Sequence, residues 1–317
     1  MTAAPPKKSW RPSASPDALR RRAERLAAIR GFFANRRIME VETPALASAG
    51  VTDVHVHSLR EAHSHRWLQT SPEYAMKRLL AAGLGDCYQI ARVFRADEVG
   101  RLHNPEFTLL EWYRLGFGVD RLMDEVEALV NLILGEAPTA RKRYRDAFLE
   151  AGLPDPLRAP DEILRGAVNR CVDGGLPADL TRDDHLDLLL DAVVVPRLPR
   201  RCFLAGYPAS QAVLARLDPA EPDTAERFEL FCDGVELANG FHECQDPAAL
   251  RQRFQADLQS RAARCAEQPA MDERLLAAME AGLPACAGVA LGVDRLFMLA
   301  EGADSLAAVM AFPWDEA

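Results

Sequence analysis

The sequence predicts an α+β fold, in which helices flank an antiparallel sheet. Residues 88–95 and 106–114 alternate apolar and polar side chains on both sides of a polar loop, as two paired strands do. Residues 228–232 and 235–241 flank Asp233-Gly234, which is the strongest short hairpin signal in the chain. Because helical patterns surround these strand pairs, we expect long antiparallel strands with peripheral helices.

The chain is expected to begin with a flexible arm, residues 1–16, which a helix and a strand follow. Ser15 and Pro16 place a capping residue and a proline where a helix begins, and apolar residues keep helical spacing behind them. Met39 and Val41 then alternate with glutamates, a pattern typical of a half-buried strand.

A second alternation, of valine with histidine, predicts a strand over residues 54–57. Further along the chain lie two more histidines, so a metal site has to be considered. His55 and His57 simply share one face of the predicted strand, and a solvent-exposed strand is the better interpretation.

Helical signals dominate several later segments. Ser71-Pro72-Glu73 repeats the order of cap, proline and acid, and starts a helix. A helix over residues 122–134 precedes a stretch, residues 138–200, that is a candidate for an inserted helical subdomain. Two more helices are expected at residues 248–266 and 272–281.

The end of the chain contains a strand-to-helix junction. Residues 289–291 are strand-like, Gly292 follows them, and a helix begins at Val293 with Arg295 in its first turn. Backbone amides and the positive end of a helix favour phosphate, and a glycine lets a nucleotide approach the backbone closely. The junction can therefore receive an anion, although a glycine at such a place often serves packing only.

The composition excludes several classes of protein. With 49% hydrophobic and 27% charged residues among 317, the chain is neither disordered nor fibrous. No apolar run approaches the ~20 residues of a membrane helix, and no secretory signal follows the first lysines, so we expect a cytoplasmic protein without a membrane partner.

Seven scattered cysteines without a CxxC pair argue against a disulfide framework and against structural zinc. A net charge of −9 does not favour non-specific binding to nucleic acid.

One face of the predicted strand 106–114 carries an unusual mixture of side chains. Side chains alternate between faces, so Phe107, Leu109, Glu111 and Tyr113 lie on the same side. An unpaired buried carboxylate is costly, which makes this face a poor candidate for pure core. We interpret it either as a binding floor, where the ring stacks and the carboxylate and phenol orient a cationic amine, or as an ordinary solvent-facing side.

The hairpin at Asp233-Gly234 brings acidic residues together. A two-residue turn places Glu229 diagonally near Glu236, at a separation of ~7–8 Å. Two carboxylates at this spacing suit a hard cation such as Mg²⁺ next to a phosphate, whereas an edge hairpin with solvated acids is the alternative. Asn239, Phe241 and Glu243 do not share the parity of Glu236, so a bulge near Ala238 is required if all four residues line one site.

Taken together and in this order, these segments resemble the three motifs of a class II aminoacyl-tRNA synthetase catalytic domain, from the lysyl branch. Residues 39–44 are similar to motif 1, whose role in the family is dimerisation, so a homodimer is implied. Residues 94–113 contain a motif 2 pattern and residues 288–295 a motif 3 pattern. The sequence Glu236-Leu-Ala-Asn-Gly-Phe-His-Glu243 resembles the amino-acid pocket of the lysyl branch. The resemblance implies one catalytic domain over residues 17–317.

The resemblance also implies roles for individual residues. The catalytic residues would be Arg95 and Arg295, and Mg²⁺ would be held by Glu229 and Glu236. The ATP-binding residues would be Arg95, Ala96, Asp97, His103, Asn104, Phe107, Glu236, Leu237, Gly292 and Arg295. The amino-acid substrate would contact Ser71, Pro72, Glu73, Glu111, Tyr113, Asn239, Glu243 and Ala290.

The short segment before motif 1 makes the resemblance more specific. Lysyl-tRNA synthetases carry an anticodon-binding domain there, and its five strands cannot fit into sixteen residues. Such a freestanding core resembles the synthetase-like enzymes that attach (R)-β-lysine to a lysine of elongation factor P. ATP, (R)-β-lysine and elongation factor P are therefore the expected substrates and partners, and anticodon-type tRNA binding is not expected.

Two positions depart from the lysyl-tRNA synthetase pattern. Ala96-Asp97 stands where those enzymes have Asn-Glu, so that either the shorter acid or the neighbouring Glu98 must reach the nucleotide. Ala290 stands where they have glycine, and its methyl group would disfavour α-lysine. A truncated tRNA-charging enzyme, a small-molecule amide ligase and a non-catalytic paralogue are the alternative functions.

Overall fold

The computed structural model describes residues 10–317 except 97, 173, 175–176, 178 and 265. Most of the expected arm, together with the expected ATP-binding residue Asp97, thus lies outside the described residues. Within the described part, no helix is both long and apolar enough to cross a bilayer.

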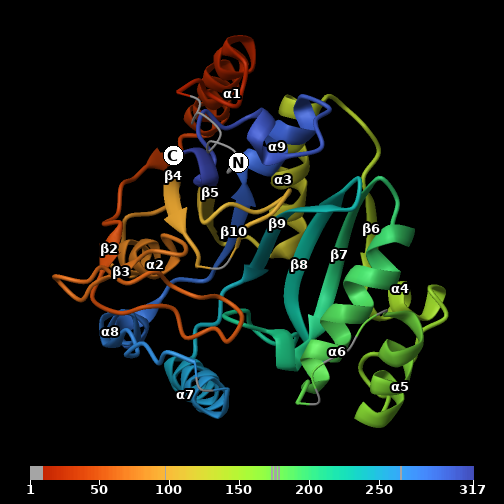
Figure 1. Ribbon diagram of the computed structural model, residues 1–317. Helices are drawn as coiled ribbons and strands as arrows, with labels where there is room; N and C mark the ends of the chain where they lie inside the picture. Colours follow the sequence, from red (N-terminus) through yellow and green to blue (C-terminus); the bar gives the residue numbers. More distant parts are fainter. Residues whose placement is uncertain (1–9, 97, 173, 175–176, 178, 265) are drawn as a thin grey trace, which may run out of the picture.

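An eight-stranded sheet forms the centre of the molecule (Figure 1), which confirms the predicted α+β fold. Its strands, in spatial order, are β1 (Met39–Glu40), β4 (Cys87–Phe94), β5 (Glu106–Leu115), β10 (Cys286–Gly292), β9 (Val235–His242), β8 (Thr224–Cys232), β7 (Arg201–Pro208) and β6 (Ala140–Arg143). The six central strands are antiparallel, and only the short edge strands β1 and β6 pair in parallel with their neighbours. A separate small sheet pairs β2 (Leu46–Ala47) with β3 (Trp67–Leu68).

The hairpin between β8 and β9 has the predicted turn and an irregular register. Asp233 and Gly234 both have positive φ, +50° and +76°, as the tight turn requires, and Cys232 pairs with Val235. Phe231 pairs with Glu236, but the preceding residue on β8 pairs with Ala238. Leu237 is therefore the extra residue of a β-bulge, one position before the expected place. The bulge puts Glu236 and Asn239 on the same face.

One face of the sheet packs against two helices, α3 (Val119–Leu134) and α9 (Val293–Ala300). Leu110 and Trp112 of β5 point into this core, where they meet apolar residues such as Val126 and Phe297. Because side chains alternate along a strand, the residues between Leu110 and Trp112 must face the other side. That other side carries the functional site.

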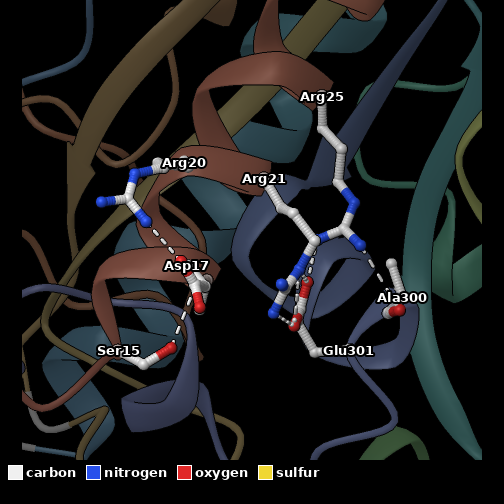
Figure 2. A network of polar contacts seen from close by, with 8 residues as sticks. Ser15, Asp17, Arg20, Arg21, Arg25, Ala300 and Glu301 are labelled. Atoms are coloured by element: carbon white, nitrogen blue, oxygen red, sulfur yellow. Dashed lines mark hydrogen bonds and ion pairs between the residues drawn. The ribbon is translucent and has the colours of Figure 1, made fainter.

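The first helix, α1 (Pro16–Asn35), begins as predicted and is tied to the end of α9. The Ser15 hydroxyl accepts a hydrogen bond from the backbone amide of Ala18, which caps the helix. Arg21 and Arg25 both form ion pairs with Glu301, at 2.5 Å (Figure 2). Part of the expected arm is also packed, because Ala14 is buried and its amide donates to the carbonyl of Met310.

The described part of the stretch 138–200 contains the α-helices α4 (Tyr144–Glu150), α5 (Asp161–Cys171) and α6 (Arg182–Leu189), and a π-helical turn (Leu190–Val194) and a 3-10 turn (Val195–Arg197) follow α6. They lie beside β6 and β7 (Figure 1). Phe148, Leu164 and Leu186 form a small core of their own, which closes against Tyr207 of β7. Since β6 joins the main sheet, this stretch is continuous with the rest of the fold.

Three more helices cover one end of the sheet: α2 (Glu73–Ala81), α7 (Pro247–Ala263) and α8 (Glu273–Gly282). The strand predicted over residues 54–57 is wrong, since these residues form a turn and an irregular loop. Arg261 of α7 fixes this loop by donating to the backbone carbonyls of Asp53 and Val56. The backbone amide of Ala96 also donates to the carbonyl of His57, so isolated hydrogen bonds replace the ladder of a partner strand.

Candidate active site

A cavity of about 900 Å³ opens on the face of the sheet opposite α3 and α9. Its floor consists of β5, β10 and β9, and the alternation predicted for β5 holds. Phe107, Leu109, Glu111 and Tyr113 all line the cavity, so the interpretation of this face as a solvent-exposed side is wrong.

The register of the three strands places small residues between functional ones. Ala290 of β10 pairs with Glu111 on one side and with Asn239 on the other. Gly288 in turn pairs with Tyr113, and a Cβ atom there would lie 2.3 Å from Cε1 of that ring. A glycine is therefore required at position 288, and the Ala290 methyl group lies on the cavity floor.

Glu111 is held by two hydroxyl groups at the buried end of the cavity. The Ser71 hydroxyl donates to its Oε2 at 2.5 Å, and the Tyr113 phenol donates to its Oε1 at 2.6 Å. Burial and, after it, the nearby Glu73 carboxylate raise the pKa of Glu111 to about 7, although both hydrogen bonds oppose this shift. A cationic ligand would restore the ionised form, so this carboxylate is suited to an amine.

A second buried carboxylate, Glu243, lies near Glu111 and pairs with Lys77. The Lys77 Nζ atom lies 2.5 Å from Oε2 of Glu243 and 2.7 Å from Oε1 of Glu73. Burial raises the pKa of Glu243 to about 8, and Lys77 opposes this shift. Sequence analysis missed Lys77. The only signal for it was its place four residues after Glu73 on a helix, where the two side chains meet.

At the other end of the cavity, Arg295 connects three segments. Its Nη1 atom donates to the backbone carbonyl of Glu236 at 2.9 Å, and its Nη2 atom lies 2.8 Å from Nε2 of His103. Burial and, after it, the charge of Arg295 lower the pKa of His103, so a neutral imidazole accepts this hydrogen bond. Motif 2, motif 3 and the β8–β9 hairpin therefore meet at this guanidinium.

Arg95 lies in the same cavity beside an aromatic ring. Its guanidinium carbon is 5.1 Å from the centre of the Phe107 ring, and its Nη1 atom is 3.5 Å from the Glu98 carboxylate. Glu98 lines the cavity, and is the described acid beside this arginine. A planar base above Phe107 would be close to a positive charge.

Most of the expected site residues line this cavity: Ser71, Glu73, Arg95, His103, Asn104, Phe107, Glu111, Tyr113, Glu236, Leu237, Asn239, Glu243, Ala290, Gly292 and Arg295. Pro72, Ala96 and Glu229 are not part of its lining. Asn104 is already engaged, since its amide donates to the carbonyl of Glu106 and accepts from the amide of Trp314.

Glu229 is buried and has several partners of its own. Its carboxylate accepts hydrogen bonds from Tyr207, at 2.6 Å, and from Arg227, at 2.5 Å. Its pKa is raised to about 7, mainly by burial and also by repulsion from Glu236. A divalent cation such as Mg²⁺ would relieve this repulsion, while both oxygens of Glu229 already accept hydrogen bonds within the protein. No group of three or more acidic, histidine or cysteine side chains suited to a metal occurs among the described residues.

The chain matches one family of known proteins over nearly its whole length. The family model of class II tRNA synthetases (D, K and N) matches residues 9–316. A protein of Vibrio cholerae serotype O1 named elongation factor P–(R)-beta-lysine ligase is 45% identical over 97% of this chain and 98% of its own length. Proteins of the same name from Salmonella gallinarum and Salmonella typhi are 48% and 47% identical, over 98% of both chains in each case.

Proposed function

Because the chain belongs to the class II tRNA synthetase family, we propose that it activates (R)-β-lysine with ATP and transfers it to a lysine of elongation factor P. The observation that carries this proposal is the cavity itself. It joins buried carboxylates suited to amines with two arginines suited to phosphates, on one continuous floor. The relatives named as elongation factor P–(R)-beta-lysine ligases support this choice of substrates.

In the first step, a carboxylate oxygen of β-lysine attacks the α-phosphorus of ATP. A new P–O bond forms, the bond to the β-phosphate oxygen breaks, and pyrophosphate leaves. Since both reactants are anionic, positioning and positive charge must lower the barrier. Arg95 would bind the α-phosphate and Arg295 the γ-phosphate, with adenine above Phe107.

Glu229 and Glu236 would hold Mg²⁺, which supplies positive charge at the phosphate oxygens when bound. The chain's own residues orient the other reactant. Glu111 and Glu243 would bind the far amine of the substrate, with Tyr113 donating to Glu111. Glu73 and Asn239, at the cavity wall, would orient the near end.

In the second step, the ε-amine of an elongation factor P lysine attacks the carbonyl carbon of the adenylate. An amide bond forms, the bond to the phosphate oxygen breaks, and AMP and a proton leave. The same cavity would serve both steps, with the adenylate held on the sheet floor while the acceptor amine enters from solvent.

The proposal also includes a homodimeric assembly and a cytoplasmic location. A homodimer is supported by β1, an edge strand in the region of motif 1, whose Met39 side chain is 52% exposed. A cytoplasmic location is supported by the six described cysteines, all of them free thiols, as a reducing compartment would keep them.

Pyrophosphate exchange tests the activation step. The wild-type protein, supplied with ATP and Mg²⁺, is expected to exchange pyrophosphate fastest with (R)-β-lysine and more slowly with α-lysine. Exchange driven best by aspartate, or by no lysine isomer, would contradict the proposed function, as would transfer of the activated amino acid to tRNA.

A further inference from the structure

Lys77 is a buried lysine that nothing in the proposed chemistry requires. Its side chain is 2% exposed, and its ammonium group lies 2.7 Å from Glu73, 2.5 Å from Glu243 and 5.2 Å from the centre of the Phe241 ring. Glu73 belongs to the same helix, one turn earlier, whereas Glu243 follows strand β9. One ammonium group thus ties together two carboxylates from different elements.

At this end of the cavity, negatively charged side chains outnumber positively charged ones. Three carboxylates, those of Glu73, Glu111 and Glu243, influence one another, and among the described residues Lys77 is the ammonium group that acts on them. When all are ionised, two negative charges remain. Buried charge is costly unless it is paired, so this arrangement is completed by a ligand with two positive charges.

The oxygen atoms that Lys77 leaves open are also informative. Both oxygens of Glu243 are fully buried and have no hydrogen-bond partner among the described residues, and the ion pair with Lys77 involves Oε2, at 2.5 Å. Lys77 likewise contacts only Oε1 of Glu73, whose side chain remains partly open to the cavity. Each carboxylate therefore keeps one oxygen for a ligand amine, in an orientation that the ion pairs hold.

Resting on the proposed function, we infer that Lys77 is a positioning residue that sets the preference of this site for amino acids with two amino groups. It holds the Glu73 and Glu243 carboxylates, and it leaves a charge deficit that matches a diamine. Burial raises the pKa of Glu243 and the ammonium group of Lys77 opposes this shift, so without Lys77 the fully buried carboxylate would take up a proton more readily. A neutral Glu243 no longer attracts the far amine.

The test compares two substrates in pyrophosphate exchange: (R)-β-lysine and the same β-amino acid without its terminal amine. In Lys77→Met, we expect KM for the diamine to rise at least tenfold, and the diamine preference in kcat/KM to fall at least tenfold. Lys142→Met is the matched control, since Lys142 is a more exposed lysine that pairs with Glu150 outside the cavity, and it should change neither value. An unchanged preference in Lys77→Met would overturn the inference even if overall activity fell, because a merely structural defect lowers both substrates together.

A crystal structure of the wild-type protein with β-lysine tests the same point if Lys77→Met does not fold. We expect Lys77 to keep both carboxylates while the two substrate amines contact their remaining oxygens. A substrate amine in the place of the Lys77 ammonium would overturn the inference. No exchange with any lysine isomer in the wild type would instead contradict the proposed function, and this outcome is distinct from a preserved preference.

Discussion

The two ends of the cavity are built differently. At the amine end, Glu111, Glu243 and Lys77 are nearly inaccessible and are held by ion pairs or short hydrogen bonds. At the phosphate end, the Arg295 side chain is 21% exposed and contacts a backbone carbonyl and the His103 ring, while the Glu236 side chain is 40% exposed. The amine end is therefore preorganised, whereas the phosphate end is left to be completed by the nucleotide.

This difference implies that substrate specificity arises at the amine end of the cavity and the catalytic rate at the phosphate end. Buried carboxylates that need a cation reject ligands without one, because an unpaired charge would remain in the protein. Partly exposed arginines discriminate less between ligands, but they stabilise charge that develops during phosphoryl transfer. We therefore expect changes at the amine end to act on substrate choice and changes at the phosphate end to act on turnover.

The largest expected effect is at the phosphate end. Arg295→Ala removes a guanidinium group from the place where the γ-phosphate binds, and we expect kcat for pyrophosphate exchange to fall by roughly 10²–10³-fold. Arg200→Ala is the control, because Arg200 lies on the exposed side of the β8–β9 turn and pairs with Asp233. Normal exchange in Arg295→Ala would refute the assigned role.

A smaller effect is expected at the amine end, with a different kinetic pattern. Glu111→Gln removes the charge that Ser71 and Tyr113 orient, which should raise KM for (R)-β-lysine by roughly 30- to 100-fold, with less change in kcat. Glu106→Gln on the same strand is the control, since its partly exposed carboxylate pairs with Arg92. A fall in kcat with KM unchanged would contradict the division between the two ends.

Ala290→Gly sharpens the comparison within the amine end. Removing the methyl group between Glu111 and Asn239 should shift the preference from β-lysine toward α-lysine by ~1–3 kcal/mol, which is about 5- to 150-fold in relative kcat/KM. Ala287→Gly, on the core face of the same strand, is the control and should leave the preference unchanged. No gain of activity toward α-lysine in Ala290→Gly would count against this role.

The smallest expected effect lies outside the cavity, where α1 meets the end of α9. Hydrogen bonds from Arg21, followed by those from Arg25, lower the pKa of Glu301 to about 2 (Figure 2). Glu301→Gln should lower the free energy of unfolding by ~1 kcal/mol or less, because solvent and salt screen this partly exposed cluster. Glu267→Gln, in an exposed pair with Arg60, should change it still less.

The pH dependence of this contribution follows from the direction of the pKa shift. A carboxyl group whose pKa is lowered by folding stabilises the folded state above its ordinary pKa near 4.5, and this stabilisation is lost as the pH falls toward 2. The difference in chemical stability between wild type and Glu301→Gln should therefore shrink below about pH 4.5. A difference that stays constant down to pH 2 would contradict the proposed ion pairs.

Local patterns predicted much of the fold and of the cavity floor. The alternation along residues 106–114 placed Glu111 and Tyr113 on one face, and Asp233-Gly234 placed the β8–β9 turn. Both signals depend on neighbouring residues, so sequence alone suffices. The convergence of Arg95, Glu236 and Arg295 came from the resemblance to a family, since no local rule connects them.

Features that depend on distant partners escaped prediction. Lys77 looked like any helical lysine, because Glu243 is far away in the sequence. Residues 54–57 alternate as a strand does, but Arg261 provides the hydrogen bonds that a partner strand would have supplied. The bulge at Leu237 was predicted only approximately, because register depends on packing against β10 as well as on the turn.

The most direct test of the proposed function is the mass of purified elongation factor P after incubation with this protein, ATP, Mg²⁺ and each lysine isomer. We expect one lysine side chain of elongation factor P to gain a single β-lysyl group, fastest with (R)-β-lysine and only when ATP is present. Elongation factor P of unchanged mass with every isomer, while ATP and the acceptor remain intact, would contradict the assignment.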